Sequence, residues 1–400
     1  MDAALHDKGE DFMPKSFFVE QAESLMEPFF ADLQAMVNID SGTYVKAGVD
    51  RLGLWLQRRF QGLGFDTYFD EQQEYGNHLV AVQRGNNPQG ARLLLIGHMD
   101  TVFPADEAVR RPFSRTQLDG IAIAKGPGVL DMKSGVLIGI YAVQLLLASH
   151  LANYQSITFV CNSDEEVGSR SSRSLIGKLA RESDAVLVLE PGRIVNRVVS
   201  ARRGIANYRV EAHGLSSHAG VEPEKGRNAI LELSHQVIAL QAINGTIPGA
   251  TLNVGIIKGG ERTNIVPDYA YCDIDVRVSD RAGLKAIEEA MRQVTSHTVL
   301  DGTSIVLSGG VSNMPFERTE ESLKLVRLAQ QVGAQLGLQI EDVSSGGASD
   351  ANTTAGLGVP TIDGLGATGG LAHNPDEYIE VDQLPVRIAL VSGLLQRLCE

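Results

Sequence analysis

The sequence predicts an α/β protein built in two parts: a mixed sheet with helices on both faces, and an inserted α+β sandwich. Three observations lead to this prediction. The chain has 400 residues, more than one hydrophobic core usually supports. Short apolar runs alternate with longer helical patterns in the first half and again after Pro315. Between residues 204 and 315 the order becomes strand, helix, strand, strand, helix, strand, which is typical of a split βαβ unit.

The main sheet is predicted from three apolar runs, at residues 92–96, 156–161 and 185–189. Residues 135–149 are too long and too uniformly apolar for a strand, and they predict a buried helix. Helices predicted at 320–336 and 384–398 complete this unit. Each strand is followed at once by polar or acidic residues. Open α/β sheets place their ligand crevices at such strand ends, so we look for chemistry there.

The domain boundaries follow from the change of pattern at Gly204. Residues 1–203 and 316–400 are predicted to form one domain, and residues 204–315 an inserted domain that folds as a unit. Its predicted strands cover 205–214, 250–260, 269–278 and 304–309, and its helices cover 228–241 and 284–297.

Composition and charge argue against several classes of function. A formal net charge of −14, with no Lys/Arg-rich run to offset it, argues against nucleic-acid binding. Cys161, Cys272 and Cys399 are widely separated, which argues against a disulfide framework or a thiolate zinc site and favours a reducing compartment. Residues 1–18 lack the apolar stretch of a signal peptide, and no run reaches the roughly 18 apolar residues of a membrane span. We therefore expect a cytoplasmic protein.

His98 and Asp100 follow the first predicted strand, in the segment GHMDTV. An imidazole at a strand end can bind zinc. Asp100, two residues later and pointing the same way, can accept the other ring N–H and fix the tautomer. Taken alone, this pattern also fits a loop histidine beside a turn-forming aspartate.

Asp131 lies in the glycine-flanked segment GPGVLDMKSG, just before the predicted apolar helix. A carboxylate on a tight turn can bridge two cations about 3.5 Å apart, the spacing that two-metal hydrolases use. The alternative is a cap at the N-terminus of that helix.

Asp164, Glu165 and Glu166 follow directly after a predicted strand. Three adjacent carboxylates repel one another unless cations or an exposed helix N-terminus compensate their charge. Successive residues point in different directions, so one of Glu165 and Glu166 can bind a metal while the other faces a bound water as general base. The alternative is an acidic first turn of a helix.

Two further candidates stand at similar positions. Glu190 ends the next predicted strand in the motif EPG, and Pro191 restricts it to an extended conformation that favours projection from the strand end. His373 lies in the loop HNPDE before the terminal helix, where a surface histidine is the alternative. Two histidines and at least three carboxylates thus fall at strand or loop ends of one unit.

In this order the motifs HMDTV, GPGVLDMKSG, DEEVGS, EPG and HNPDE resemble the co-catalytic zinc peptidase family of glutamate carboxypeptidase, aminoacylase, acetylornithine deacetylase and succinyl-diaminopimelate desuccinylase. The inserted segment is similar as well, in the motifs SHAG, GRNA, TNIVP and DVR. The likeness covers nearly the whole chain and is greatest to the carboxypeptidase G branch. It implies a zinc-peptidase catalytic domain and a ferredoxin-like lid that also forms a homodimer.

The resemblance implies two Zn²⁺ per subunit, with Co²⁺ or Mn²⁺ as alternatives. His98 and Glu190 would hold one ion. Glu166 and His373 would hold the other, and Asp131 would bridge the two.

The resemblance also gives catalytic roles to two neighbours of the ligands. Glu165 would take a proton from a water shared by the ions, whose pKa they lower, and would deliver it to the departing amine. Asp100 would orient His98. A cis peptide bond is expected between Asp131 and Met132.

Four residues are implied in substrate or transition-state binding. His218 would stabilise the oxyanion, often in the site of the partner subunit. Arg277 would bind a substrate carboxylate bidentately, with Asn264 nearby. Gly347 would offer a backbone N–H to the same anion at a helix start. The ordinary alternatives are turn caps for His218, Asn264 and the glycine loop, and a surface ion pair for Arg277.

Glu190 also bears on the substrate. In the family, carboxypeptidases and deacylases carry glutamate at this ligand, and aminopeptidases and dipeptidases usually carry aspartate. We therefore expect a small peptide or N-acyl amino acid with a free carboxylate. Residues 312–315, SNMP, stand where related sequences often have an arginine before proline, which leaves the side-chain preference open. The alternatives are an N-acyl-amino-acid deacylase with the same chemistry and a catalytically silent binder of an amino-acid derivative.

Overall fold

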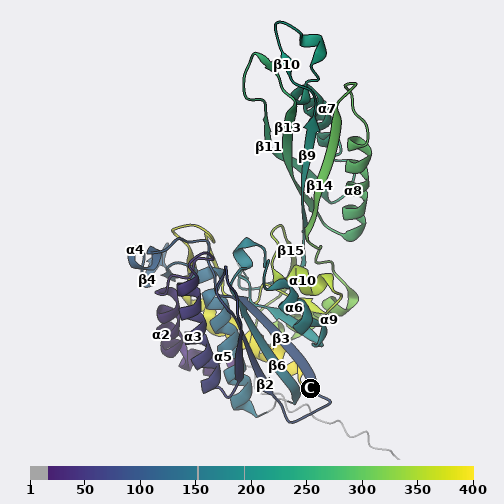
Figure 1. The fold of residues 1–400 in the computed structure, drawn as a ribbon. Coiled ribbons are helices and arrows are strands. Elements are labelled where there is room, and N and C mark those ends of the chain that lie inside the picture. The colour runs from purple at the N-terminus through teal and green to yellow at the C-terminus, as the bar shows by residue number, and fades with distance from the viewer. Residues whose placement is uncertain (1–16, 151–152, 193) are drawn as a thin grey trace, which may run out of the picture.

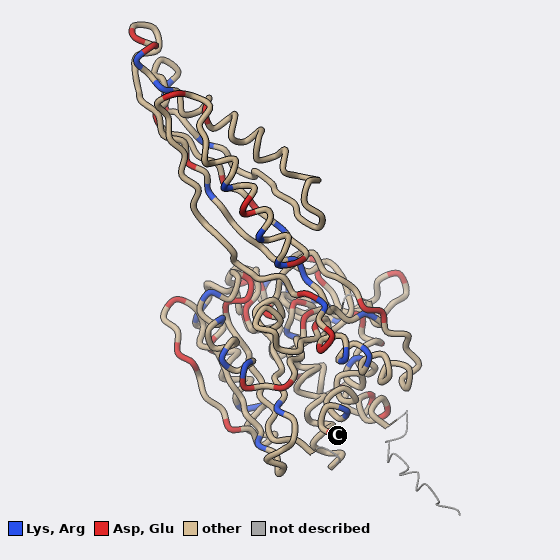
Figure 2. The backbone as a smooth tube through the Cα atoms, turned by 90° about the vertical axis from the view of Figure 1, so that its right-hand side faces the viewer, with Lys and Arg blue, Asp and Glu red and all other residues tan. Residues whose placement is uncertain are grey.

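The computed structural model describes residues 17–150, 153–192 and 194–400, arranged as a main unit from which residues 204–313 project as a slender arm (Figures 1 and 2). We call the arm the projecting unit. Each unit has its own hydrophobic core. The segment 1–18, where no signal peptide was expected, lies largely outside the described residues.

The main unit is organised around a six-stranded sheet of order β1-β2-β6-β3-β7-β16. The last four of these strands are parallel, and β2 runs antiparallel to both of its neighbours, β1 and β6, so the sheet is mixed. The three predicted strands are confirmed as β3, β6 and β7. In sheet order the bounds are β1 (Asp66–Asp70), β2 (His78–Arg84), β6 (Tyr154–Asn162), β3 (Ala91–His98), β7 (Ala185–Val188) and β16 (Thr361–Ile362).

Helices cover both faces of this sheet, as the fold class predicts (Figure 1). Along β3, Leu93 and Leu95 enter one core, and Leu94 and Ile96 enter the other, because successive side chains of a strand point to opposite faces. The first core includes α1 (Phe17–Ser24), α2 (Met26–Val37), α3 (Lys46–Gly62), α5 (Ser134–Ser149), α9 (Glu320–Gln335) and α11 (Leu384–Leu398). The second core lies under α6 (Arg173–Arg181) and α10 (Asp350–Gly356).

The apolar helix predicted at 135–149 is confirmed as α5. Nearly every side chain on it is buried, because β3 packs on one side and α2 and α11 on others. Residues Val129–Ser149 are long and apolar enough to span a membrane by composition, but 83% of their apolar 18-residue window is buried inside the main unit. Its apolar character is thus explained by its central place in the core.

The projecting unit is an antiparallel sheet of order β11-β13-β9-β14 with two helices on one face. The order matches the predicted split βαβ arrangement. Alternate residues of the central strand β9, from Ala206 to Ala212, are buried under the helices, and the opposite face is polar, with Arg209 paired to Asp273. Its elements are β9 (Gly204–His213), α7 (Ala229–Gln241), β11 (Ala250–Gly259), β13 (Tyr269–Val278), α8 (Arg281–Thr295) and β14 (Ser304–Asn313).

Two small sheets, which the sequence did not predict, hold the loops around the main sheet. One has the order β17-β18-β5-β4, and it fixes the loop between β17 and β18 that carries His373. The other pairs β8 with β15 in parallel. The bounds are β4 (Ser114–Leu118), β5 (Ile121–Lys125), β17 (Gly369–Gly370), β18 (Tyr378–Glu380), β8 (Arg197–Arg202) and β15 (Glu341–Ser345), with the short helix α4 (Glu107–Arg110) before β4.

The chain passes between the two units twice, at Arg203 and at Met314. The Asn352 side-chain amide donates hydrogen bonds to both backbone carbonyls, at 3.1 Å to Arg203 O and 2.7 Å to Met314 O. Arg202 and Phe316 exchange two backbone hydrogen bonds of 3.0 Å beside this point. α10 of the main unit therefore anchors both connections through one buried side chain.

Candidate metal centre

The main sheet brings the five predicted ligands to one edge. His98 ends β3, Glu166 lies in the 3₁₀ turn η2 (Glu165–Val167) that follows β6, and Glu190 follows β7. Because β3, β6 and β7 are parallel neighbours, their carboxyl ends meet. Asp131 comes from the irregular turn η1 (Val129–Lys133) before α5, and His373 comes from the loop between β17 and β18.

Asp131 lies between the two histidines. Its Oδ1 is 3.1 Å from His98 Nε2, and its Oδ2 is 3.3 Å from His373 Nε2. Glu190 Oε1 lies on the His98 side, 3.8 Å from Nε2. Glu166 Oε2 lies on the other side, 3.1 Å from His373 Nε2. The five side chains thus form two donor sets that share one carboxylate, in the same pairing that the resemblance implies.

The donor sets fit divalent cations. Nitrogen and oxygen ligands about 2.0–2.2 Å from a tetrahedral zinc lie roughly 3.3 Å from one another, close to the separations found here. Donor atoms of His98, Asp131 and Glu166 lie within 4.8 Å of one another, as do those of His98, Glu165 and Glu190. The Glu166 Oε1 atom is buried without a hydrogen-bond partner in the described part of the chain. A cation would satisfy this atom.

Asp100 holds several residues of the cluster in place through hydrogen bonds. The backbone carbonyl of Asp100, 3.0 Å from His98 Nδ1, accepts the ring N–H, and the carboxylate lies farther away, at 3.5 Å. This differs from the prediction, in which the carboxylate was the acceptor. The carboxylate instead accepts the backbone N–H groups of Glu165 and Glu166, both at 3.2 Å, and the Thr43 hydroxyl at 2.7 Å. It therefore fixes the acidic turn directly.

The electrostatics of the cluster favour positive charge. Burial, and then the negative charge of Glu190, raise the pKa of Glu165 well above its usual value. Burial and the charge of Asp131 do the same to the pKa of Glu190. Hydrogen bonds that the His373 ring donates to the carboxylates of Asp131 and Glu166 raise the pKa of His373 to about 10. Burial lowers the pKa of His98, but the neighbouring carboxylates of Asp100 and Asp131 outweigh burial and raise this pKa overall.

Glu377 is a residue of the site that the sequence did not single out, although it stands in the HNPDE motif. Its buried carboxylate accepts the backbone N–H groups of Leu130 at 2.6 Å and Asp131 at 3.1 Å. It therefore holds the turn that presents Asp131. The bond between Asp131 and Met132 is cis, as expected.

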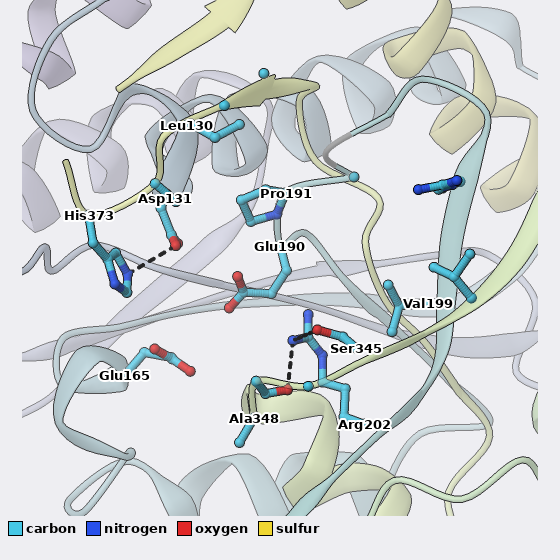
Figure 3. A pocket seen from close by; sticks show the side chains of 18 of the residues that line it. Leu130, Asp131, Glu165, Glu190, Pro191, Val199, Arg202, Ser345, Ala348 and His373 are labelled. Atoms are coloured by element: carbon cyan, nitrogen blue, oxygen red, sulfur yellow. Dashed lines mark hydrogen bonds and ion pairs between the residues drawn. The ribbon is translucent and has the colours of Figure 1, made fainter. Parts of the chain in front are cut away.

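A cavity of about 790 Å³ opens on the Glu190 side of the cluster (Figure 3). Arg202 reaches into it from the end of β8, with its Nε 2.6 Å from Asp363 Oδ2. Its Nη1 donates to the Gly347 carbonyl at 3.1 Å, so the glycine loop also lines this cavity. The Ser349 side chain caps the helix start there, and the anion-binding role of Gly347 stays a prediction. The sequence analysis did not single out Arg202, which lies just before the projecting unit begins.

A second hollow of about 520 Å³ lies on the Glu166 side. Its wall is largely apolar and includes Tyr44, Val102, Phe103 and Pro104. Tyr44 has 70% of its surface exposed and rests beside Tyr75, with ring centroids 6.1 Å apart. The metal cluster is therefore flanked by one polar cavity and one apolar hollow.

The candidates of the projecting unit do not line either space in the same chain. His218 lies in the short strand β10 (Ser217–His218), which pairs with β12 (Ile265–Val266) near the outer end of the arm, and Asn264 precedes β12 (Figure 1). Arg277 makes a two-point contact of 2.8 and 3.0 Å with Asp275, the surface ion pair that was its alternative. The substrate-binding roles of these three residues stay predictions.

Comparison with known proteins agrees with this geometry. A family model described as peptidase family M20/M25/M40 matches residues 94–397. Carboxypeptidase G2 of Pseudomonas sp. strain RS-16 is 32% identical over 378 residues, covering 92% of this chain and 88% of the relative. A succinyl-diaminopimelate desuccinylase of Cupriavidus necator is 27% identical over 367 residues, covering 86% and 92%.

Solved structures share the fold. The aminopeptidase PepT of Bacillus cereus has a TM-score of 0.78 at 24% identity, covering 94% of this chain and 99% of that one. The M20 family metallo-carboxypeptidase Sso-CP2 of Sulfolobus solfataricus has a TM-score of 0.68 at 17% identity, covering 92% and 98%. With a family match over most of its length and two histidines sharing the Asp131 carboxylate, this chain belongs to peptidase family M20/M25/M40 as a metal-dependent hydrolase.

Proposed function

We propose that the chain is a dizinc hydrolase that cleaves the amide bond to a C-terminal amino acid in a small peptide or N-acyl amino acid. The observation that carries this proposal is the shared carboxylate of Asp131, whose two oxygens face His98 and His373 beside Glu165. His98, Asp131 and Glu190 would hold one ion, and Asp131, Glu166 and His373 the other.

The pair of ions would supply a polarised carbonyl and a water of lowered pKa. Glu165 lies next to this centre, and the backbone bond to Asp100 fixes its position. From there Glu165 can take a proton at a carboxylate oxygen and later release it to the departing amine nitrogen.

The polar cavity supports recognition of a free carboxylate. Arg202 and Arg197 both line it, together with the glycines of residues 346–347. Planar guanidinium groups and exposed backbone N–H groups are the usual partners of carboxylates. A substrate whose C-terminal carboxylate enters this cavity would place its acyl half toward the Tyr44 hollow on the other side of the cluster.

The second candidate is an N-acyl-amino-acid deacylase. The same cluster would perform it, and the likeness to a succinyl-diaminopimelate desuccinylase favours it. A catalytically silent binder has less support, because the general base candidate Glu165 and both donor sets are complete.

We also propose a homodimer formed through the projecting unit. β11 is an edge strand that exposes Ile256 and Ile257, and the helix α7 packed against it exposes Ile238 with 71% of its surface accessible. A second copy could pair with this edge and bring its own His218 toward the cavity. Light scattering tests this proposal: the wild type should be a dimer and an Ile238→Asp variant a monomer. A monomeric wild type would exclude the proposal.

A cytoplasmic location stays a prediction.

The decisive experiment is a hydrolysis screen of zinc-loaded protein. N-acetyl, N-benzoyl, N-succinyl and folyl conjugates would be compared, each with the C-terminal residue varied. A Glu165→Gln variant should lose about 10²- to 10⁴-fold in kcat while it retains its zinc. Glu74→Gln, on an exposed loop, is the matched control and should keep full activity. No turnover of any conjugate by the wild type would favour the silent binder.

A further inference from the structure

The C-terminal helix α11 carries an arginine that is fully buried and has no acidic partner. The Arg387 side chain is 0% exposed. Within the described ranges no carboxylate pairs with it, and burial lowers its pKa to about 10. Taking a charge out of water is unfavourable unless polar groups surround it. The contacts of this side chain should therefore explain its place in the core.

The bonds of the Arg387 guanidinium all go to backbone carbonyls, and these belong to two segments distant in the chain. Its Nε donates to Gly366 O at 2.9 Å, and its Nη2 donates to Gly364 O. Its Nη1 donates to Val195 O at 3.0 Å and to Arg197 O at 3.2 Å. The rigid fork of guanidinium donors suits such a set of acceptors. One side chain thus fastens the two segments to each other.

Both segments adjoin Glu190, the ligand candidate that follows β7. The Gly366 N–H donates to the Glu190 carbonyl at 2.8 Å, and the Gly192 N–H donates to Ala367 O at 3.0 Å. A Cβ atom on Gly192 would lie 2.7 Å from Arg387 Nη2, so the guanidinium occupies the space beside the glycine of the EPG motif. The backbone of the ligand is therefore held against the segment that the arginine fastens.

The arginine acts on Glu190 through this backbone, because none of its hydrogen bonds reaches the carboxylate. The ligands of the other ion have separate supports. The Asp100 carboxylate accepts the backbone N–H of Glu166, and the sheet that contains β17 and β18 fixes the loop of His373. The two halves of the metal centre are thus held by different parts of the main unit.

We propose that Arg387 is a positioning residue for the metal centre, which fixes the backbone of Glu190 and so sets the affinity for the ion on the His98 side. This inference rests on the dizinc site of the proposed function. Loss of the guanidinium should weaken the binding of one ion and spare the other.

The test is zinc binding by the full chain, measured by titration against a chromophoric chelator and by elemental analysis. The wild type should hold two ions, and one of them should bind about 10- to 100-fold more weakly in Arg387→Met, the usual loss for a residue that supports a ligand. Arg387→Lys keeps the charge but has one nitrogen in place of the fork, so it should restore this affinity only in part. Ser392→Ala, buried on the same helix, is the matched control and should bind both ions as the wild type does.

A double variant separates positioning from a general loosening of the fold. Glu190→Gln should weaken the same ion that Arg387→Met weakens. Adding Arg387→Met to Glu190→Gln should then leave the affinity for the remaining ion unchanged, because the two changes act on one ligand. A weaker remaining ion in the double variant would show that Arg387 supports the whole fold, and the proposal would fail.

Other results would also overturn the proposal. Equal weakening of both ions in Arg387→Met would remove the selective role. Wild-type affinity for both ions in Arg387→Lys would exclude the fork of donors as the cause, even if Arg387→Met failed to fold. Two tightly bound ions in both Arg387 variants, with hydrolysis intact, would refute this inference and leave the proposed function standing. Selective loss of one ion in a protein that hydrolyses no conjugate would support the inference and refute the proposed function.

Discussion

The Asp100 carboxylate accepts the backbone N–H of Glu165 at 3.2 Å, so the general base candidate is held by a residue two positions after the metal ligand His98. The other carboxylate oxygen of Asp100 accepts the backbone N–H of Glu166, and the backbone carbonyl of Asp100 accepts the ring N–H of His98. One buried aspartate thus sets the relative positions of two predicted ligands and the base. The Thr43 hydroxyl, at 2.7 Å, holds the aspartate in place.

Replacing Asp100 with asparagine should therefore damage the site without unfolding the protein. An amide has one acceptor oxygen, and its NH₂ group would face the N–H groups of the acidic turn. We expect zinc affinity or kcat/KM to fall about 10- to 100-fold, as is usual for residues that support metal ligands. Metal titration and kinetics would measure this. Asp119→Asn, in the exposed turn between β4 and β5, should have no effect.

Much of the fold follows from local pattern. The runs at 92–96 and 185–189 are strands, and 135–149 is a helix, because each apolar stretch has a length that suits one element and not the other. The order of elements in the projecting unit could also be predicted, since buried residues alternate with partly or fully exposed residues along the whole of β9. The small sheets could not be predicted, because β17 and β18 have only 2 and 3 residues, and β18 pairs with β5, which lies far away in the chain.

The sequence predicted the site residues that stand in motifs at strand ends. It did not predict the residues whose contacts come from segments distant in the chain. His98, Asp131 and His373 converge as predicted. Arg202 carries no local signal, because its partner Asp363 is distant in sequence. The acceptor of the His98 ring N–H was also wrong in detail, since a side-chain and a backbone oxygen of one residue cannot be told apart from spacing alone.

Arg202 gives a prediction about stability. Its Nε lies 2.6 Å from Asp363, and the two side chains are 8% and 0% exposed. Arg202→Met would leave a buried carboxylate without its charged partner, at a cost of about 3–5 kcal/mol in the free energy of unfolding. Urea denaturation would measure this. Arg92→Met removes an arginine from a half-exposed pair with Asp184 and should cost about 1 kcal/mol or less. Equal losses in the two variants would contradict the argument.

Removal of metal should destabilise the fold. Four carboxylates and two histidines crowd the centre, and ligands that bind only the folded state add stability, about 2.7 kcal/mol at a free concentration 100 times Kd. Dipicolinate should therefore lower the Tm measured by calorimetry, and added Zn²⁺ should restore it. Elemental analysis provides the control. An unchanged Tm in protein shown to have lost its bound metal would argue against a cation at this cluster.

The cysteines should resist alkylation in the folded state. Cys161, Cys272 and Cys399 are free and buried, and burial raises the pKa of Cys272 to about 11 and that of Cys399 to about 12. A raised thiol pKa keeps the reactive thiolate scarce below that pH, whereas unfolded thiols ionise near pH 8.5. Iodoacetamide at pH 8 should label none of the three in native protein and all three in guanidinium chloride, as read by mass spectrometry. Labelling of native Cys272 at pH 8 would contradict its burial.

Tyr44 should select the acyl half of the substrate. Its ring is largely exposed, yet Tyr75 beside it and the hydrogen bond from Thr43 to Asp100 hold its segment rigidly next to the metal centre. A planar apolar acyl group could stack on this ring, and such contacts contribute about 0.5–1.5 kcal/mol, or roughly 2- to 12-fold. Tyr44→Ala should lower kcat/KM by that factor for N-benzoyl substrates and leave N-acetyl substrates nearly unchanged. Tyr68→Ala, an exposed tyrosine on β1, is the matched control. Equal losses on both substrates would show that Tyr44 supports the fold of the site, because a residue that contacts the acyl group must distinguish a large acyl group from a small one.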